Sequence, residues 1–162
     1  MRRGLLLVPV LLLAACGGGG KHAATTTTAP VVPKPGPGTV LYSNPPWAVV
    51  VDGGKATALH LVNNTWVPDT SGKVKIAILG PKGDAKPMPQ VAAELSAKKP
   101  LVESALWVDG VELLEKGGGL TPTKGTIYGA PSAPLAKGKH VGVAYARTAD
   151  HATAVAWTFR VV

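Results

Sequence analysis

The stretch Thr153–Val161, which reads TAVAWTFRV, decides the fold of this chain. Alternate positions of an extended strand share one face. One face of this stretch carries four apolar side chains: Val155, Trp157, Phe159 and Val161. The opposite face carries Thr158 and Arg160. The pattern predicts a β-strand that brings two large aromatic side chains into a core.

Short runs of alternating or β-branched residues continue back from this strand, and several of them end in turn residues. They occupy residues 90–97, 104–108, 111–114, 125–128 and 140–147. No window in residues 39–162 keeps apolar residues at helical spacing over three turns. Six or seven short strands predict an all-β chain folded as an antiparallel β-sandwich. Gly117-Gly118-Gly119 lacks the strand-to-helix context of a phosphate loop and predicts a flexible connection.

A second group of strand patterns lies toward the N-terminus. Trp47–Val51 runs into Asp52-Gly53-Gly54, and Lys55–Val62 runs into Asn63-Asn64 before a short strand at residues 65–67. Both turn sequences tolerate the positive φ that tight hairpins need. We therefore expect a β-hairpin meander, either as an added sheet of the same domain or as a small separate unit.

The next strand pattern, Lys73–Leu79, places Val74, Ile76 and Ile78 on one face and two lysines on the other. That arrangement is typical of a half-buried sheet. Glycine and proline then break the chain at residues 80–81. We place the meander subdomain in residues 39–79 and the sandwich in residues 80–162.

Three segments of the second half resemble the bacterial immunoglobulin-like domains of exported proteins. They are Leu106–Gly110 (LWVDG), Leu135–Val143 (LAKGKHVGV) and Ala156–Val161 (AWTFRV). The resemblance covers about half of the chain. It implies an immunoglobulin-like sandwich, a fold that serves as a spacer, an adhesion module or an addition to an enzyme.

Two positions in this region need separate comment. The segment Arg147–Ala152 (RTADHA) lacks the glycine of the family's Asp-x-x-Gly-Asn turn, so we expect a longer or differently shaped loop. His140 stands where related sandwiches carry a tyrosine that hydrogen-bonds back across a corner. An imidazole N–H can make the same bond, which predicts a structural role for His140.

The N-terminus has the features of an export signal. A basic start, Met1–Gly4, precedes the apolar run Leu5–Ala15, which is too short to cross a bilayer as a finished helix. The run ends in Leu13-Ala14-Ala15-Cys16, which resembles the lipobox of bacterial lipoproteins. The resemblance implies that residues 1–15 are a signal peptide and that a diacylglycerol is attached to Cys16. An ordinary signal peptide that happens to end near a cysteine is the alternative.

The composition of residues 16–38 predicts a disordered tether. They are rich in glycine, threonine and proline, have no hydrophobic periodicity, and cannot bury enough apolar surface to offset the entropy of ordering. We expect an exported protein, anchored by lipid on the outer side of the cytoplasmic membrane or in the outer membrane.

The charge of the chain suggests its partners. The formal net charge of the 162 residues is +8, and removal of Arg2 and Arg3 with the signal peptide lowers it to +6. Since the protein is expected outside the cytoplasm, nucleic acid is not a predicted partner. Envelope proteins, anionic lipid headgroups or anionic wall polymers remain.

Sequence motifs of catalysis are missing. The chain has no Gly-x-Ser-x-Gly, no His-Glu-x-x-His and no phosphate-loop motif, and its only cysteine is the predicted lipid attachment site. We therefore predict that it is not an enzyme and holds no metal or other cofactor. An accessory or small enzyme acting on wall polymers is one alternative. A periplasmic carrier of a ligand or metal is another, and it requires His60 and His151 to lie close together beside a carboxylate.

The predicted function is a non-catalytic binding or structural module at the cell surface. Exposed aromatic and basic side chains are candidates for a binding surface, and they comprise Trp66, Trp107, Lys137 and Lys139. Each tryptophan is alternatively a core residue, because the chain holds few aromatic residues. We also expect that Lys98-Lys99 and the lysines at 137 and 139 can meet at one end of the sandwich.

Overall fold

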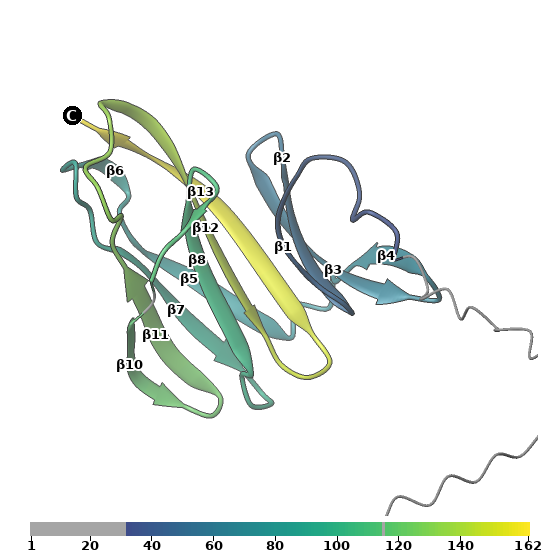
Figure 1. The fold of residues 1–162 in the computed structure, drawn as a ribbon. Coiled ribbons are helices and arrows are strands. Elements are labelled where there is room, and N and C mark those ends of the chain that lie inside the picture. The colour runs from purple at the N-terminus through teal and green to yellow at the C-terminus, as the bar shows by residue number, and fades with distance from the viewer. Residues whose placement is uncertain (1–31, 115) are drawn as a thin grey trace, which may run out of the picture. The chain divides into compact units, whose positions relative to one another are not determined.

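The strands of this protein form three sheets, in which all neighbouring strands but one pair are antiparallel (Figure 1). This is a computed structural model, and it describes residues 32–114 and 116–162, with residues 116–120 described by their backbone alone. The described residues contain no helix, so none of them forms a helix that could cross a membrane. The predicted signal peptide, Cys16 and most of the predicted tether lie outside the described residues.

Two of the layers form the predicted sandwich. One sheet has the order β10-β11-β7-β5. Its strands are β5 (Val74–Gly80), β7 (Val91–Ala97), β10 (Lys116–Thr121) and β11 (Lys124–Gly129). The other has the order β6-β13-β12-β8-β9. Its strands are β6 (Gly83–Ala85), β8 (Glu103–Val108), β9 (Val111–Glu112), β12 (Gly138–Arg147) and β13 (Ala152–Val161).

This arrangement is an immunoglobulin-like sandwich, which confirms the predicted fold class. All neighbouring strands in the two sheets are antiparallel except β6, which runs parallel to the end of β13. Burial of apolar side chains between the sheets drives their association. Phe159 and Val161 of β13 are buried there as predicted, together with Leu95, Leu106 and Ile127.

One glycine is needed where the last two strands meet. Gly142 lies opposite Trp157 in the pairing of β12 with β13. A Cβ atom at position 142 would come within 2.5 Å of the indole ring. The Trp157 ring therefore lies over β12 only because residue 142 has no side chain.

The third layer is the predicted meander, a sheet of order β1-β2-β3-β4. Its strands are β1 (Thr39–Asn44), β2 (Trp47–Asp52), β3 (Lys55–Val62) and β4 (Thr65–Pro68). Its turns have the expected positive φ, with values of 54° and 79° at Gly53 and Gly54 and of 47° and 60° at Asn63 and Asn64. These are the values that two-residue hairpin turns require.

The meander packs on the outer face of the β6-β13-β12-β8-β9 sheet. Trp47 and Val49 of β2 are buried against Trp107, Val143 and Tyr145 of that sheet. Residues 31–162 accordingly form one compact unit. The meander is therefore an added layer of the same domain, which was one of the two alternatives.

The strand after the meander belongs to the sandwich. Strand β5 pairs with β7, with Val74 opposite Ala97 and Ile78 opposite Ala93, and makes no pair with β4. Its apolar face lies in the core of the sandwich, where Val74 is buried and Ile76 and Ile78 are half-buried. A boundary after residue 79 therefore does not match the sheet pairing, in which the meander ends with β4 and the sandwich begins with β5.

The predicted tether is shorter than residues 16–38. Pro35 is buried, and the Trp66 indole N–H donates a hydrogen bond of 2.7 Å to the Pro33 carbonyl. Trp66 also packs against Ala48, Val50 and Leu59 on the face of the meander that points away from the sandwich. The segment from Pro33 onward is thus part of the folded unit, since it is held by this hydrogen bond and buries Pro35.

Three strands have no counterpart among the predicted ones: β1, β6 and β10. The run Gly117-Gly118-Gly119, expected to be a flexible connection, lies in β10 and pairs with β11. Glycine has no side chain to show a face, so alternation cannot reveal a strand there. Strand β6 has only three residues, which is too short for a pattern.

Candidate functional site

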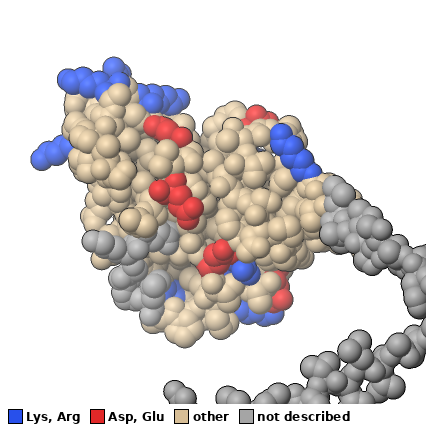
Figure 2. All heavy atoms as spheres, in the orientation of Figure 1, with Lys and Arg blue, Asp and Glu red and all other residues tan. Residues whose placement is uncertain are grey.

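The candidate site is the end of the sandwich where β12 begins and β13 ends. Figure 2 shows lysine and arginine side chains gathered at the end that carries β6 and the last residues of β13. We call this group the basic end, and it comprises Lys82, Lys86, Lys137, Lys139 and Arg160, all of them exposed. Lys137 and Lys139 were predicted as surface residues, and the structure places both there.

Strand pairing brings the members of the basic end together. Lys139 of β12 lies directly opposite Arg160 of β13. Strand β6 runs beside the end of β13, and Lys82 and Lys86 flank that strand on its two sides. The backbone N–H of Leu135 donates to the Pro87 carbonyl at 2.8 Å, which ties the segment before Lys137 to the segment after Lys86.

The basic end holds an excess of positive charge. Within the described part of the chain, no salt bridge joins any of its five cations to an acid. Asp84 lies opposite Arg160 across β6 and β13, and it shares a shallow hollow of about 420 Å³ with Lys137 and Arg160. Like charges placed directly opposite across two strands repel, so Lys139 and Arg160 favour a bound anion.

The loop that carries Lys137 is held by His140. The His140 ring is buried, with Nε2 at 2.8 Å from the Ala136 carbonyl and Nδ1 at 2.6 Å from the Asp109 carboxylate. Asp109 also accepts a 2.9 Å hydrogen bond from the Val141 backbone N–H. The bond to Ala136 is the expected bond back across the corner. Asp109 has a φ of 50° in a tight turn, which places its carboxylate under the ring.

Both ring nitrogens of His140 face an acceptor, which favours the doubly protonated ring. The hydrogen bond to Asp109, followed by the bond to the Ala136 carbonyl, raises the pKa of His140 above its ordinary 6.5. A histidine with a raised pKa stabilises the fold fully below the unfolded value, and this contribution is lost as pH rises through the folded pKa. His140 therefore contributes most to stability in mildly acidic solution.

Replacing Asp109 by asparagine should remove this pH dependence. The carboxamide keeps an acceptor oxygen but loses the negative charge, so the pKa of His140 should fall toward its ordinary value. NMR titration of the His140 ring measures that shift, and urea unfolding at roughly pH 6 and pH 9 measures its effect on stability. An unchanged His140 pKa in D109N would contradict the assigned role of the carboxylate. His60→Gln is the control, since it removes a histidine away from this corner.

The two candidate tryptophans lie elsewhere. Trp107 is 1% exposed, between the meander and the sandwich, so it is a core residue and not part of a binding surface. Trp66 is half-buried, and its indole N–H is engaged by Pro33. Burial of these large rings stabilises the meander. Neither ring belongs to the basic end.

The expected meeting of Lys98-Lys99 with Lys137 and Lys139 does not occur. Lys99 forms a 2.6 Å salt bridge with Asp150 in the loop that joins β12 to β13. That loop is at the Arg147 end of β12, whereas Lys139 is at the Gly138 end. The two lysine pairs therefore lie at opposite ends of the sandwich.

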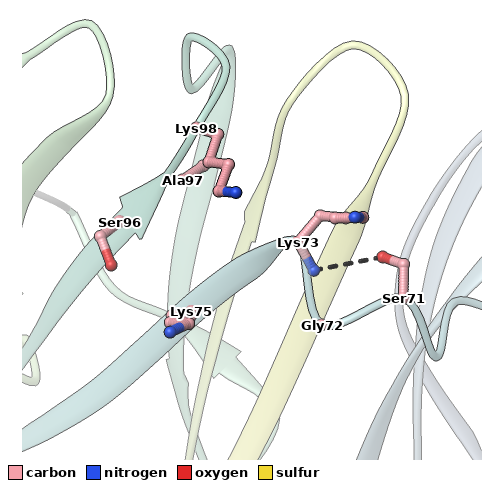
Figure 3. A pocket seen from close by; sticks show the side chains of 7 residues that line it. All are labelled: Ser71, Gly72, Lys73, Lys75, Ser96, Ala97 and Lys98. Carbon is pink, nitrogen blue, oxygen red and sulfur yellow. Dashed lines mark hydrogen bonds between the residues drawn. The ribbon is translucent and has the colours of Figure 1, made fainter.

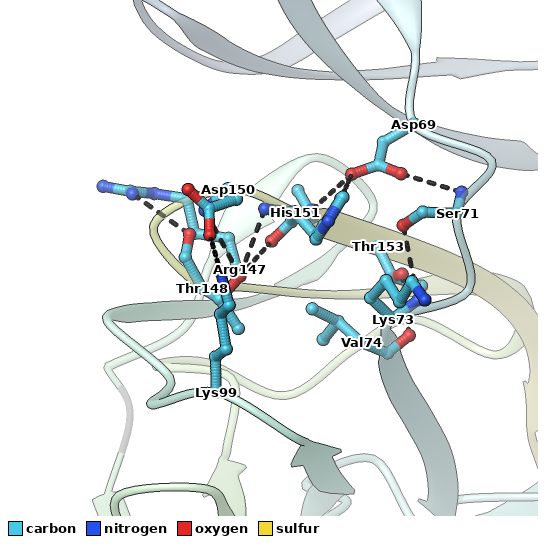
Figure 4. Close-up of polar contacts among 11 residues, drawn as sticks. Asp69, Ser71, Lys73, Val74, Lys99, Arg147, Thr148, Asp150, His151 and Thr153 are labelled. Carbon is cyan, nitrogen blue, oxygen red and sulfur yellow. Dashed lines mark hydrogen bonds and ion pairs between the residues drawn. The ribbon is translucent and has the colours of Figure 1, made fainter.

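The loop of residues 148–151 replaces the expected glycine turn with side-chain hydrogen bonds. The Thr148 hydroxyl accepts bonds from the backbone N–H groups of Asp150 and His151, at 3.3 and 3.1 Å (Figure 4). Thr148 N–H donates to the His151 carbonyl at 2.8 Å. A buried threonine thus closes this loop without glycine.

The two histidines of the carrier alternative, His60 and His151, line the same hollow, which holds about 330 Å³. His151 Nδ1 lies 3.4 Å from Asp69, whereas His60 stacks on Trp47 with the ring centroids 4.2 Å apart. Among the described residues, no three His, Cys, Asp or Glu side chains are placed to hold a metal ion. The contact of His151 with Asp69 links the loop before β13 to the segment that follows β4.

Arg160, Lys82 and Lys86 were not predicted as site residues. The only signal for Arg160 is its place on the outward face of the last strand, and such positions are ordinary for a solvated sheet. Lys82 and Lys86 become neighbours of Lys139 only through the parallel pairing of β6 with β13.

Comparisons with known proteins identify no family for this chain. No protein-family model matches the chain, and no curated protein matches it. Among solved structures, it is similar to one described as "Titin Ig tandem domains A164-A165". The TM-score is 0.37 and the sequence identity 6%, over 75% of each chain.

Proposed function

We propose that this protein is a lipid-anchored, non-catalytic module of the cell envelope that binds anionic polymers through the basic end. The anchor is the lipobox cysteine, Cys16, and the folded unit that begins near residue 32 presents the basic end. The polymers are those of the envelope whose phosphate or carboxylate groups repeat along a chain.

The observation that supports this proposal most strongly is the unbalanced charge of the basic end. Five exposed cations lie there beside Asp84, with no salt bridge to any described acid. A linear polyanion would neutralise the repulsion between Lys139 and Arg160 and release its own counterions. Exposed lysines also move freely, which suits a repeating and variable ligand better than a rigid one.

The hydrogen bonds of His140 support the same function. They hold the segment from Ala136 to Val141, so that Lys137 and Lys139 project from a fixed backbone. A fixed backbone lowers the entropy lost on binding.

Binding to immobilised long-chain polyphosphate tests the proposal. The full-length protein in non-ionic detergent should bind at low salt and be released as salt rises. The double variant K137E/K139E should bind at least about tenfold more weakly at low salt, which corresponds to about 1.4 kcal/mol. The slope of log K against log salt concentration should become less steep by about 1.4, because each of the two lost cation contacts contributes about 0.7 to it.

The matched control is K34E/K55E, which changes the net charge equally at two exposed lysines, one before β1 and one in β3. This control should keep the affinity within about threefold, since neither lysine belongs to the basic end. Equal weakening in both variants would mean that net charge alone governs binding, and the basic end would then have no special role. Retention that ignores salt would also contradict the proposal.

A further inference from the structure

A second group of cations lies at the opposite end of the sandwich, around a hollow of about 420 Å³. Figure 3 shows the hollow, where the start of β5 faces the end of β7. Five side chains that could bind an anion line it: Ser71, Lys73, Lys75, Ser96 and Lys98. We call this group the lysine hollow.

The lysines of the hollow differ from two neighbouring lysines, which form salt bridges with acidic side chains. Lys99 is paired with Asp150 at 2.6 Å, and Lys124 is paired with Glu94 at 3.1 Å. No such pair involves Lys73, Lys75 or Lys98 within residues 32–114 and 121–162. Acidic partners thus compensate the charge of two lysines beside the hollow but not of the three lysines that line it.

Two hydroxyl groups supply neutral donors beside these charges. Strand pairing sets Ser96 directly opposite Lys75 on one side and Lys124 on the other. The Ser71 oxygen accepts a weak 3.3 Å bond from the Lys73 backbone N–H, which leaves its own proton free to donate. Ammonium and hydroxyl donors together are suited to the several acceptor oxygens of a phosphate group.

The wall of the hollow formed by residues 71–73 is fixed from both sides. Asp69 accepts bonds from Ser71 N–H at 2.9 Å and from Ala152 N–H at 2.8 Å (Figure 4). The Thr153 hydroxyl donates to the Val74 carbonyl at 2.9 Å. The segment that joins the meander to the sandwich is therefore fastened to β13, and the hollow is formed before any ligand arrives.

We propose that the lysine hollow binds a small anion that carries one or more phosphate groups. Its volume exceeds that of a single phosphate ion and suits an oligophosphate or a phosphorylated glycerol or sugar. The phosphate could belong to a free molecule or to a lipid headgroup. This site is independent of polymer binding at the basic end, because the two lie at opposite ends of the sandwich.

Isothermal titration of the full-length protein in non-ionic detergent tests the site with two probes, tripolyphosphate and glycerol phosphate. Tripolyphosphate should bind at low ionic strength, and K73A/K98A should weaken it about tenfold or more. Ser96→Ala, which leaves the charge unchanged, should weaken it about threefold through loss of a hydrogen bond. Glycerol phosphate binding as tightly as tripolyphosphate would identify a single phosphate group as the ligand, and tighter binding of a short-chain phosphatidic acid would then assign it to a lipid headgroup. Tighter tripolyphosphate binding would identify a free oligophosphate.

The matched control is K34A/K55A, which removes the same charge from two exposed lysines that do not line the hollow. It should change the affinity less than twofold, as should K137E/K139E at the basic end. Equal weakening by K73A/K98A and K34A/K55A would overturn the proposal, and so would the absence of tripolyphosphate binding to the unaltered protein. Loss of binding in K137E/K139E alone would assign the anion to the basic end instead.

Discussion

Replacing Trp107 by alanine is expected to lower the free energy of unfolding by about 3–5 kcal/mol, the usual cost of removing a large buried aromatic ring. Trp107 is 1% exposed and lies on the face of β8 that the meander covers. Its ring contacts both layers, so its loss leaves a cavity between them. Most natural domains are stable by only about 5–15 kcal/mol, so this change removes a large part of the total.

Urea unfolding followed by circular dichroism measures this effect. Trp66→Ala is the comparison, with an expected loss of about 1–2 kcal/mol, because that ring is half-buried and makes one hydrogen bond. If both substitutions cost the same, Trp107 would not be the main contact between meander and sandwich. A surface role for Trp107 predicts almost no change in stability.

Replacing Cys16 by serine is expected to abolish lipid attachment, which is the largest change foreseen for any single residue. A serine hydroxyl cannot form the thioether to diacylglycerol. Stable membrane anchoring needs two acyl chains or a chain with a second signal, so the variant loses its proposed anchor. The folded unit from residue 32 onward should keep its stability, since Cys16 lies outside it.

Labelling of growing bacteria with an alkyne-bearing fatty acid measures attachment directly. The unaltered protein should carry the label and sediment with membranes, whereas C16S should carry none. Gly17→Ser is the control, because it alters the adjacent residue and keeps the thiol. Label that persists in C16S would disprove the lipobox assignment. The label is the deciding readout, because an uncleaved apolar run at residues 5–15 could itself hold C16S at the membrane.

Most strands of the fold were predictable because alternating apolar and polar residues mark the two faces of each strand within its own sequence. The alternation in residues 153–161 identified the core face of β13, and Asp109-Gly110 marked a tight turn that the structure contains. The bond of His140 back across the corner was expected only through the resemblance to related sandwiches, and the structure shows that its acceptor is the Ala136 carbonyl. Strands without this local signal, such as the glycine-rich β10, were not predicted.

The candidate sites were predictable only in part. Lys137 and Lys139 are exposed, as basic residues usually are, but Arg160 joins them through a register that pairs β12 with β13. The lysine hollow depends on the pairing of β5 with β7, which a boundary after residue 79 had concealed. Both sites bring together residues from strands that are separated along the chain.

The sequence by itself determined the strand patterns, the tight turns and the export and lipidation signals proposed for the N-terminus, because each of these depends on residues that are close together along the chain. Only the tertiary structure decided that Trp107 is buried under the meander, that β5 belongs to the sandwich and that Lys139 faces Arg160. The physical reason is that an alternating strand shows which face is apolar but not which distant strand or layer will cover it. That choice is made by packing and hydrogen bonding over the whole domain.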